Sequence, residues 1–163
     1  MKKIFFLTIT LLCLSGMQAQ GFGIGISGGY LTELDGIGGS ADLIYEFDDK
    51  WGVSSTFTFA AKDDTGVRAK WTIFDLNGRY NVIEELYLIA GGEYLSVNLR
   101  ELGLGGGNPT GGTRTSTASD YGINAGTGYK YNVVDNINIF AEVKYVIFDT
   151  GYLHARLGIL FDL

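Results

Sequence analysis

Proline, cysteine and histidine are almost missing from this sequence, and each occurs once, as Pro109, Cys13 and His154. A single cysteine cannot close a disulfide within the chain, and a single histidine does not make a metal site. The shortage of proline beside 25 glycines, 10 tyrosines and 10 phenylalanines favours long paired strands over helices or disorder. The sequence therefore predicts an all-β protein with no cofactor, no metal site and no catalytic residue.

Long apolar runs are also missing once the first twenty residues are set aside. No later run reaches the ~18 residues that would cross a bilayer as a helix. Residues 1–20 are predicted to be a signal peptide, because Lys2 and Lys3 precede the apolar residues 4–14 and a cleavage position is expected near Ala19. Cys13 lies inside that peptide, so the exported chain, residues 21–163, is expected to contain no cysteine and no disulfide.

Basic residues are the third shortage. Without Lys2 and Lys3 the chain has 10 basic and 18 acidic residues, a formal charge of −8. Nucleic-acid binding requires a basic surface, so this class of function is excluded.

The clearest pattern that is present is an alternation of apolar and polar residues over residues 120–148. Residues two apart share a face of a β-strand, and alternation over this length predicts a strand. The pattern breaks at residues 132–136 and then resumes, which predicts an antiparallel hairpin. The first strand of the hairpin places on one face Tyr121, Ile123, Ala125, Thr127, Tyr129 and Tyr131.

The same alternation predicts six further strands, which begin near residues 21, 39, 51, 68, 86 and 153. Turns are expected at residues 32–38, 48–50, 62–66 and 149–151, and residues 100–117 form the one long strand-free segment, rich in Gly, Ser and Thr. In the strand over residues 68–80, Trp71 and Ile73 are out of phase with Phe74 and Leu76. This predicts either a bulge or an extension outside the membrane.

A short internal repeat supports this division of the chain. Residues 79–86 match residues 130–137 in residue class at all positions but one, and both segments join a strand to the next. A meander of similar hairpins accounts for the match. Eight strands with seven connections then leave both chain ends on the same side.

The size of the side chains on each face decides which face is outside. A barrel of eight strands is only just wide enough to be filled by side chains, so the face of Gly, Ser and Thr with scattered charges belongs inside. The large apolar face then meets lipid, which distinguishes a membrane barrel from a soluble one. We predict a closed antiparallel eight-stranded up-and-down transmembrane β-barrel over residues 21–163. Its interior charge network is predicted to comprise Asp42, Glu46, Asp75, Arg79, Glu93, Lys130, Glu142, Lys144 and Arg156.

The lengths of the connections predict the orientation in the membrane. Short turns of such barrels face the periplasm and longer loops face outward. Three short turns are therefore expected in the periplasm with both chain ends, and the longest loop, residues 100–117, is expected outside.

This pattern, over residues 21–163, resembles the small eight-stranded outer-membrane barrels such as OmpX and the transmembrane domain of OmpA. The resemblance implies an integral protein of the outer membrane that is exported through its signal peptide. It implies insertion by the barrel-assembly machinery, contact with outer-membrane lipids and lipopolysaccharide, and a monomeric state. A surface partner could be met through residues 100–117.

Candidate chemistry is sparse in the sequence. His154 has Arg156 as its neighbour on the same face and no nearby serine, so a histidine held by the charge network is expected rather than a catalytic one. Glu142 and Lys144 are expected to pair structurally rather than to exchange protons. Arg68 and Lys70 lie near the predicted outer rim, where they could meet lipopolysaccharide phosphates, although an ordinary solvated rim is the simpler expectation.

Three function classes therefore remain. The first is a structural or surface-interaction barrel that exposes residues 100–117. The second is a narrow channel for small solutes, which the filled interior disfavours. The third is a lipid-modifying enzyme, which the missing Ser–His–acid set disfavours. The first class is expected, and no enzymatic activity is predicted.

Overall fold

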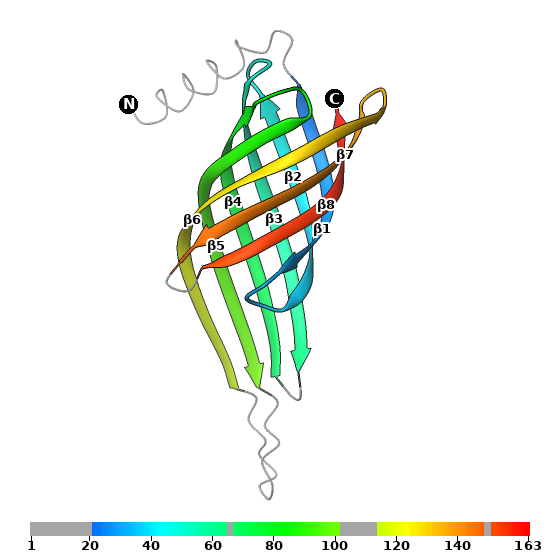
Figure 1. Ribbon diagram of the computed structural model, residues 1–163. Coiled ribbons are helices and arrows are strands. Elements are labelled where there is room, and N and C mark those ends of the chain that lie inside the picture. Colours follow the sequence, from blue (N-terminus) through cyan, green and yellow to red (C-terminus); the bar gives the residue numbers. More distant parts are fainter. Residues whose placement is uncertain (1–20, 65–66, 102–113, 149–150) are drawn as a thin grey trace, which may run out of the picture.

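Eight antiparallel strands close into a barrel in the computed structural model of the chain (Figure 1), which describes residues 21–64, 67–101, 114–148 and 151–163. Each strand pairs with the next along the chain, and β1 pairs with β8 to close the ring. The predicted up-and-down barrel is confirmed, whereas the predicted signal peptide lies outside the described residues. The strands are β1 (Phe22–Leu31), β2 (Gly36–Glu46), β3 (Trp51–Asp64), β4 (Val67–Asn81), β5 (Leu86–Glu101), β6 (Arg114–Val134), β7 (Ile137–Ile147) and β8 (Tyr152–Asp162).

Among the described residues, no helix is long and apolar enough to span a membrane.

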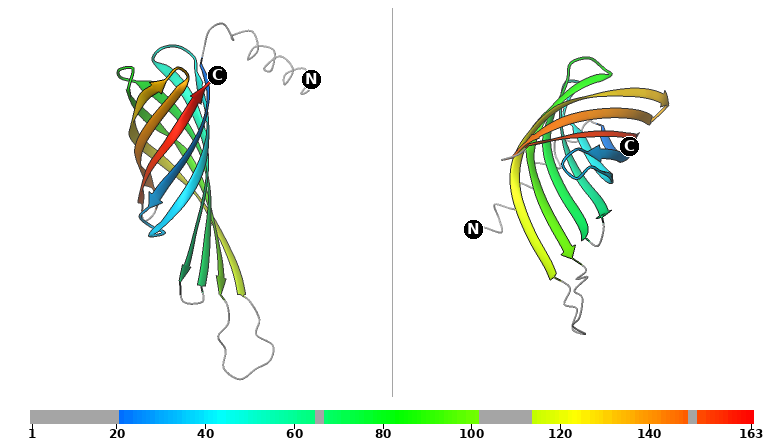
Figure 2. Two further views of the ribbon diagram at one scale, coloured as in Figure 1. Left: turned by 90° about the vertical axis from the view of Figure 1, so that its right-hand side faces the viewer. Right: turned by 60° about the horizontal axis from the view of Figure 1, so that its bottom comes forward.

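The strands differ in length, and this gives the molecule two parts. β1, β2, β7 and β8 have 10 or 11 residues, whereas β3 to β6 have 14 to 21. The four long strands continue past the barrel as a curved sheet on the side away from the chain ends (Figures 1 and 2). We call this part the projecting sheet: residues 61–64 of β3, 67–72 of β4, 96–101 of β5 and 114–122 of β6.

The start of β1, the end of β8 and the three short turns lie at the other end of the barrel, which we call the terminal end (Figure 1). The Leu163 N–H donates to the Phe22 carbonyl oxygen at 2.8 Å. In the first short turn, the Asp48 carboxylate accepts the N–H groups of Lys50 and Trp51, both at 2.7 Å. Such a side-chain acceptor fixes a tight turn without help from the rest of the sheet. We call the opposite end, which carries the projecting sheet, the distal end.

Several predicted boundaries were wrong, and most errors lie at the distal end. β2 begins at Gly36 and β3 continues to Asp64, inside segments that we predicted to be turns. Residues 100–101 and 114–117, predicted to be loop, are paired in β5 and β6, and residues 102–113 lie outside the described residues. At residues 100 and 115–117 no side chain is buried, and polar residues such as Ser and Thr occupy both faces of the sheet, as they do in loops.

The pairing of β4 shows whether a bulge accounts for the phase of Trp71 and Ile73. β4 pairs without interruption with β3 from Val67 to Tyr80 and with β5 from Val67 to Asn81, so the predicted bulge is wrong. Trp71 and Ile73 face the interior of the barrel, where they belong to a buried apolar cluster. The alternative, an extension beyond the membrane, stays a prediction. Among the described strand pairs a register shift occurs between Asn132 and Val134, next to a short turn.

The outer wall of the barrel is apolar, with aromatic side chains towards both ends. At the terminal end the Trp51 and Tyr80 rings lie 4.8 Å apart, and towards the distal end Tyr94 and Tyr121 lie 5.0 Å apart. Exposed Leu, Ile and Val side chains lie between these rings. An apolar band bounded by aromatic girdles is the surface that a membrane barrel presents to lipid.

Candidate functional site

Arg156 is the centre of one buried cluster of charges in the barrel. Its guanidinium contacts the Asp42 carboxylate at 2.5 Å and the Glu142 carboxylate at 2.7 Å. The Tyr87 hydroxyl donates to Glu142 at 3.0 Å, and Arg79 lies over the Tyr87 ring with its Cζ 3.8 Å from the ring centroid. Two cations face two carboxylates here, so the charges of this layer balance.

Lys144 is the centre of a second cluster, towards the distal end. Its ammonium contacts the Asp75 carboxylate at 2.5 Å and the Glu93 carboxylate at 2.8 Å. The Tyr152 hydroxyl donates to Glu93, and the Asn124 amide donates to Asp75 at 3.2 Å. Each carboxylate therefore has a neutral donor besides the shared ammonium.

Glu46 and Lys130 lie apart from both clusters, near the terminal end. They pair with each other at 3.4 Å and keep part of their side chains exposed. The structure thus places all nine charged residues named above on the inner face, in three groups rather than one continuous network. The tyrosines that complete the two buried groups, Tyr87 and Tyr152, were not anticipated, although Tyr87 shares the phase of Glu93 on β5.

His154 occupies the inner face between the two buried cations. It lies directly opposite Lys144 in the β7–β8 ladder, and 1% of its surface is exposed. Neither ring nitrogen has a hydrogen-bond partner among the described residues, so the expectation that the charge network holds this ring is wrong. No described group of three or more His, Cys, Asp and Glu residues could hold a metal ion.

Apolar layers cover the charged clusters at both ends. At the terminal end Ile44, Phe140 and Leu160 form a small buried cluster. At the distal end a larger one, the distal plug, comprises Leu31, Leu34, Ala60, Trp71, Ile73, Leu95, Val146 and Tyr152. The space bounded by Asp42, Arg79, Lys130 and Arg156 is too narrow for a water molecule. Packed side chains therefore fill this part of the interior.

The connection between β1 and β2 folds over the distal plug. Leu34 belongs to the plug, and Asp35 has the unusual positive φ of 48°. The Tyr30 hydroxyl donates to the Asp35 carboxylate, and Lys62 of β3 pairs with it at 3.1 Å. The hydrogen bond from Tyr30, with the Lys62 ammonium, lowers the pKa of Asp35 below its ordinary value.

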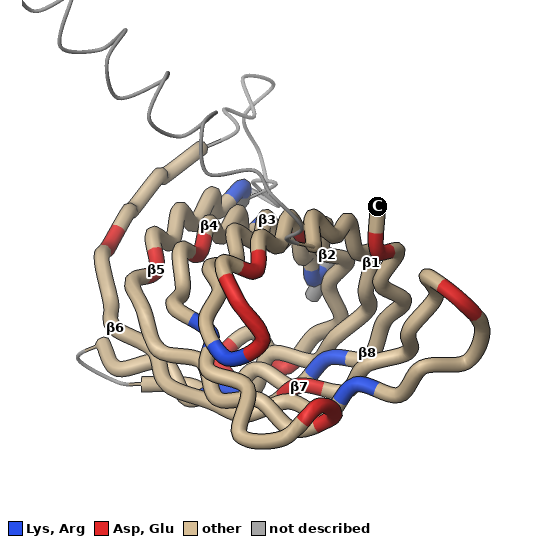
Figure 3. Tube along the Cα trace, turned by 90° about the horizontal axis from the view of Figure 1, so that it is seen from above, with Lys and Arg blue, Asp and Glu red and all other residues tan. Residues whose placement is uncertain are grey.

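The two ends of the molecule carry different charges. The terminal end is acidic: its turns present Asp48, Asp49, Glu84, Glu85 and Asp135, with Lys50 as their cation, and Figure 3 shows these acidic turns in red nearest the viewer. The described side chains of the distal end include Lys62, Arg68, Lys70 and Arg100 beside Glu33, Asp35 and Asp120.

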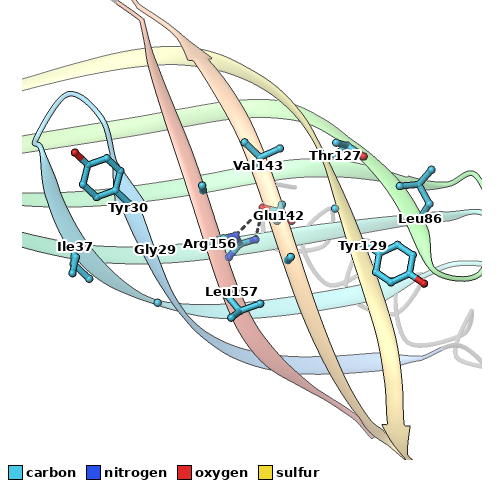
Figure 4. A pocket seen from close by; sticks show the side chains of 14 residues that line it. Gly29, Tyr30, Ile37, Leu86, Thr127, Tyr129, Glu142, Val143, Arg156 and Leu157 are labelled. Carbon is cyan, nitrogen blue, oxygen red and sulfur yellow. Dashed lines mark hydrogen bonds and ion pairs between the residues drawn. The ribbon is translucent and has the colours of Figure 1, made fainter.

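A shallow groove of about 680 Å³ crosses the outer wall over β1, β8, β7 and β6. Figure 4 shows its rim, with Tyr30 and Ile37 at one end and Leu86 and Tyr129 at the other, and the Arg156–Glu142 pair behind its floor. The groove belongs to the apolar band. Its partners in a bilayer are therefore acyl chains.

The projecting sheet has an unpaired edge along β6. The printed ladder between β6 and β7 begins at Ile123, so among the described residues, residues 114–122 of β6 pair with β5 alone. The Asp120 carboxylate accepts the N–H of Tyr121 at 2.8 Å, which satisfies one backbone donor with a side chain. The rest of this edge offers backbone donors and acceptors to another strand.

Comparison with known proteins gives matches in structure alone. No protein-family model and no curated protein matches this sequence. The crystal structure of a major outer membrane protein from Thermus thermophilus has a TM-score of 0.74 at 15% identity, covering 90% of this chain and 100% of the other.

Two further solved structures agree at lower similarity. Ail, the attachment invasion locus protein of Yersinia pestis, has a TM-score of 0.58 at 16% identity, over 88% of this chain and 97% of the other. Neisserial surface protein A has a TM-score of 0.58 at 12% identity, over 90% and 99%.

The fold is that of the small eight-stranded outer-membrane barrels, as the resemblance to OmpX and the OmpA transmembrane domain predicted. With an outer wall that is apolar between two aromatic girdles, the chain is an integral protein of the outer membrane.

Proposed function

We propose that this protein is a surface-interaction barrel, which is anchored by the sealed barrel and presents the projecting sheet outside the cell. The observation that carries the proposal is the unpaired edge of β6, residues 114–122, at the end of the molecule opposite the chain ends. An exposed edge binds an extended segment of a partner by adding it as a further strand. The names of Ail, for attachment and invasion, and of the Neisserial surface protein support a surface role.

The orientation follows from the lengths of the connections. Barrels of this class keep short turns and chain ends in the periplasm and longer strands and loops outside. The three short turns here share the terminal end with both chain ends. The distal end, with the projecting sheet, therefore faces outward. A single chain closes the barrel without a partner, which fits a monomer inserted by the barrel-assembly machinery.

The other two classes of function fit the geometry less well. A channel requires a continuous path, whereas the distal plug and the small apolar cluster cover both ends of the charged interior. A lipid-modifying enzyme requires a reactive group that substrate can reach, and His154 is almost fully enclosed. We infer that the protein is not an enzyme and that its interior charges hold the barrel together.

Labelling of intact cells tests the orientation. Cysteine is introduced at Thr117 of the unpaired edge or, as the matched control, at Asp48 of a short turn, and cells are treated with a maleimide that does not cross membranes. Thr117→Cys is expected to react on intact cells and Asp48→Cys only after the outer membrane is permeabilised. The reverse pattern would reject the proposal.

A pair of proline variants tests the unpaired edge itself. Consecutive N–H groups of a strand point to opposite sides of the strand. Of the two variants Ala118→Pro and Ser119→Pro, one therefore removes a backbone donor from the unpaired edge, and the other removes a backbone donor that bonds to β5. A photo-crosslinker at Thr117 reports contacts on cells. We expect the edge variant to lose crosslinks while the sheet stays folded, and equal crosslinking in both variants and the parent would contradict strand addition.

A further inference from the structure

The charges of the cluster around Lys144 do not balance, unlike those of the cluster around Arg156. The Lys144 ammonium contacts both Asp75 and Glu93, and these three side chains make two carboxylates and one ammonium, a net charge of −1. None of the three is more than 3% exposed, so water does not screen the excess charge. A buried charge is costly unless it is paired.

The excess charge falls on one atom, Asp75 Oδ2. Glu93 uses both of its oxygens, since Oε2 accepts from Lys144 at 2.8 Å and Oε1 accepts from the Tyr152 hydroxyl. Asp75 Oδ1 accepts from Lys144 and, at 3.2 Å, from the Asn124 amide. Asp75 Oδ2 has no hydrogen-bond partner among the described residues. A further positive charge is therefore needed at this oxygen.

Two amide oxygens of the same region also lack donors. Asn77 and Asn124 are 3% and 4% exposed, and neither Oδ1 atom has a hydrogen-bond partner among the described residues. The Asn124 amide donates through Nδ2 to Asp75 Oδ1, which fixes its orientation and holds its oxygen beside the carboxylate. A buried acceptor without a partner costs free energy, so these oxygens favour a ligand that they share.

Gly91 allows the two amides to approach each other. It is the direct neighbour of Asn77 on β4 and of Asn124 on β6, in one row across three strands. A Cβ atom on Gly91 would lie 2.3 Å from Asn77 Oδ1, so this oxygen occupies room that a side chain at residue 91 would take. The Asn77 oxygen is thus turned across β5 towards Asn124, whose own amide reaches Asp75 across the same strand.

A monovalent metal cation fits both the charge and the atoms. Carboxylate and amide oxygens are ligands of hard cations, and carbonyl oxygens hold sodium in membrane transporters. One positive charge brings the net charge of the cluster to zero, whereas a divalent ion would reverse its sign. The expectation of no metal site came from the shortage of Cys and His, which such a cation does not require.

A proton is the main competitor for this position. A proton on Asp75 Oδ2 would balance the charge, but it could be donated to one amide oxygen only, and the other would still lack a partner. A proton on His154 would add a third positive charge beside Lys144 and Arg156, and neither nitrogen of that ring is hydrogen-bonded to these oxygens. A metal cation serves all three oxygens at once.

We propose that Asp75 Oδ2, Asn77 Oδ1 and Asn124 Oδ1 bind one monovalent metal cation inside the barrel. The cation neutralises the cluster around Lys144 and is the partner that the three oxygens lack. It is enclosed as the barrel folds, because the distal plug covers this cluster. The site depends neither on the orientation of the barrel in the membrane nor on the unpaired edge of β6.

Refolding in different salts tests the site. The full chain is refolded from urea into detergent micelles with sodium chloride or choline chloride at equal ionic strength, and the unfolding temperature is followed by the heat-dependent gel shift. Choline is a monovalent cation too bulky for three side-chain oxygens. We expect a saturable rise in unfolding temperature with sodium and none with choline. An equal rise with both would overturn the proposal, because ionic strength alone would account for it.

Three variants identify the ligands. Asn77→Leu keeps a side chain of similar shape, removes one oxygen and is expected to lose the sodium-dependent rise. Asn81→Leu, the same change at another buried asparagine of β4, is the matched control and is expected to keep it. Asp75→Asn removes the excess charge and is expected to unfold at the same temperature in both salts, which keeps the test decisive if Asn77→Leu does not fold. A sodium-dependent rise that persists in Asp75→Asn would overturn the proposal.

Two further measurements separate the cation from a proton. Protein refolded and crystallised with thallium(I) in place of sodium is expected to show anomalous scattering beside Asp75, and the Asp75→Asn variant is expected to show none there. A shared proton would instead give an unfolding temperature that rises as the pH falls and does not change with sodium. That result, or the absence of an anomalous peak beside Asp75, would overturn the cation site.

Discussion

Glycine at a few inward positions makes room for the large side chains that fill the lumen. A Cβ atom built on Gly128 would lie 2.1 Å from the Tyr87 ring, so this ring reaches Glu142 only because residue 128 has no side chain. The outward Gly78 has a different setting, since the nearest atom to its Cβ position is the Ala90 carbonyl oxygen at 3.7 Å.

Gly128→Ala is therefore expected to destabilise the barrel by about 1–3 kcal/mol through overpacking, whereas Gly78→Ala is expected to be close to neutral. Urea titration of refolding into lipid vesicles, followed by gel mobility, measures both. Equal effects of the two variants would show that the Tyr87 ring moves aside at little cost.

Lys144 is the one cation that contacts two buried carboxylates, and its loss leaves both without their shared partner. Lys144→Met is expected to cost about 3–5 kcal/mol, the usual penalty for breaking a buried ion pair. The triple variant that adds Asp75→Asn and Glu93→Gln removes the stranded charges and is expected to recover much of this loss. A triple variant less stable than Lys144→Met would refute this account.

Asp35 gives the connection between β1 and β2 a dependence on pH. Its pKa is lower in the folded protein than the ordinary 3.8, so its stabilising contribution is complete above that value and is lost as the pH falls through the lower folded value. In a carboxyl NMR titration, Tyr30→Phe is expected to raise the pKa of Asp35, and Lys62→Gln to raise it less. An unchanged midpoint in Tyr30→Phe would contradict the hydrogen bond.

At the scale of one element, β4 shows how a strand changes its surroundings along its length. Near the terminal end its inner face carries Arg79, Asn77 and Asp75, and further on the same face carries Ile73 and Trp71 in the distal plug. The Trp71 ring packs edge-on against Tyr152 with 5.8 Å between centroids.

Trp71→Ala is expected to destabilise the barrel by about 3–5 kcal/mol, because a large aromatic side chain is lost from a packed cluster. Thr72→Ala, the adjacent residue on the outer face, is the control and is expected to change stability by less than about 0.5 kcal/mol. Thermal unfolding in micelles compares them, and similar losses in both would deny the plug a role in stability.

β4 also marks the limit of what the sequence could predict. The alternation of apolar and polar residues placed Asp75 and Arg79 on the inner face of β4, because residues two apart share a face along the whole strand. The partner of each charge could not be predicted, since Lys144 meets Asp75 through the closure of the barrel rather than through neighbouring strands. Residues 114–117 were missed because polar residues on both faces give no periodic signal.

For the molecule as a whole, the filled interior predicts its electrical behaviour. Among the described residues, apolar clusters lie towards both ends of the barrel with paired charges between them, and this filling is expected to block hydrated ions. Purified barrels in planar bilayers are expected to show negligible conductance, with a known porin as the positive control. Large, steady single-channel currents would instead place the narrow channel first among the function classes.

The hydrogen bond from Leu163 N–H to the Phe22 carbonyl joins the first and last strands within reach of a short linker. Residues 21–163 could therefore be circularly permuted, with residues 21 and 163 joined and new ends opened between two strands at the distal end. Such a barrel would carry both of its ends on the projecting side. A fused peptide would then be displayed beyond the membrane by a scaffold whose interior pairs and plug remain untouched.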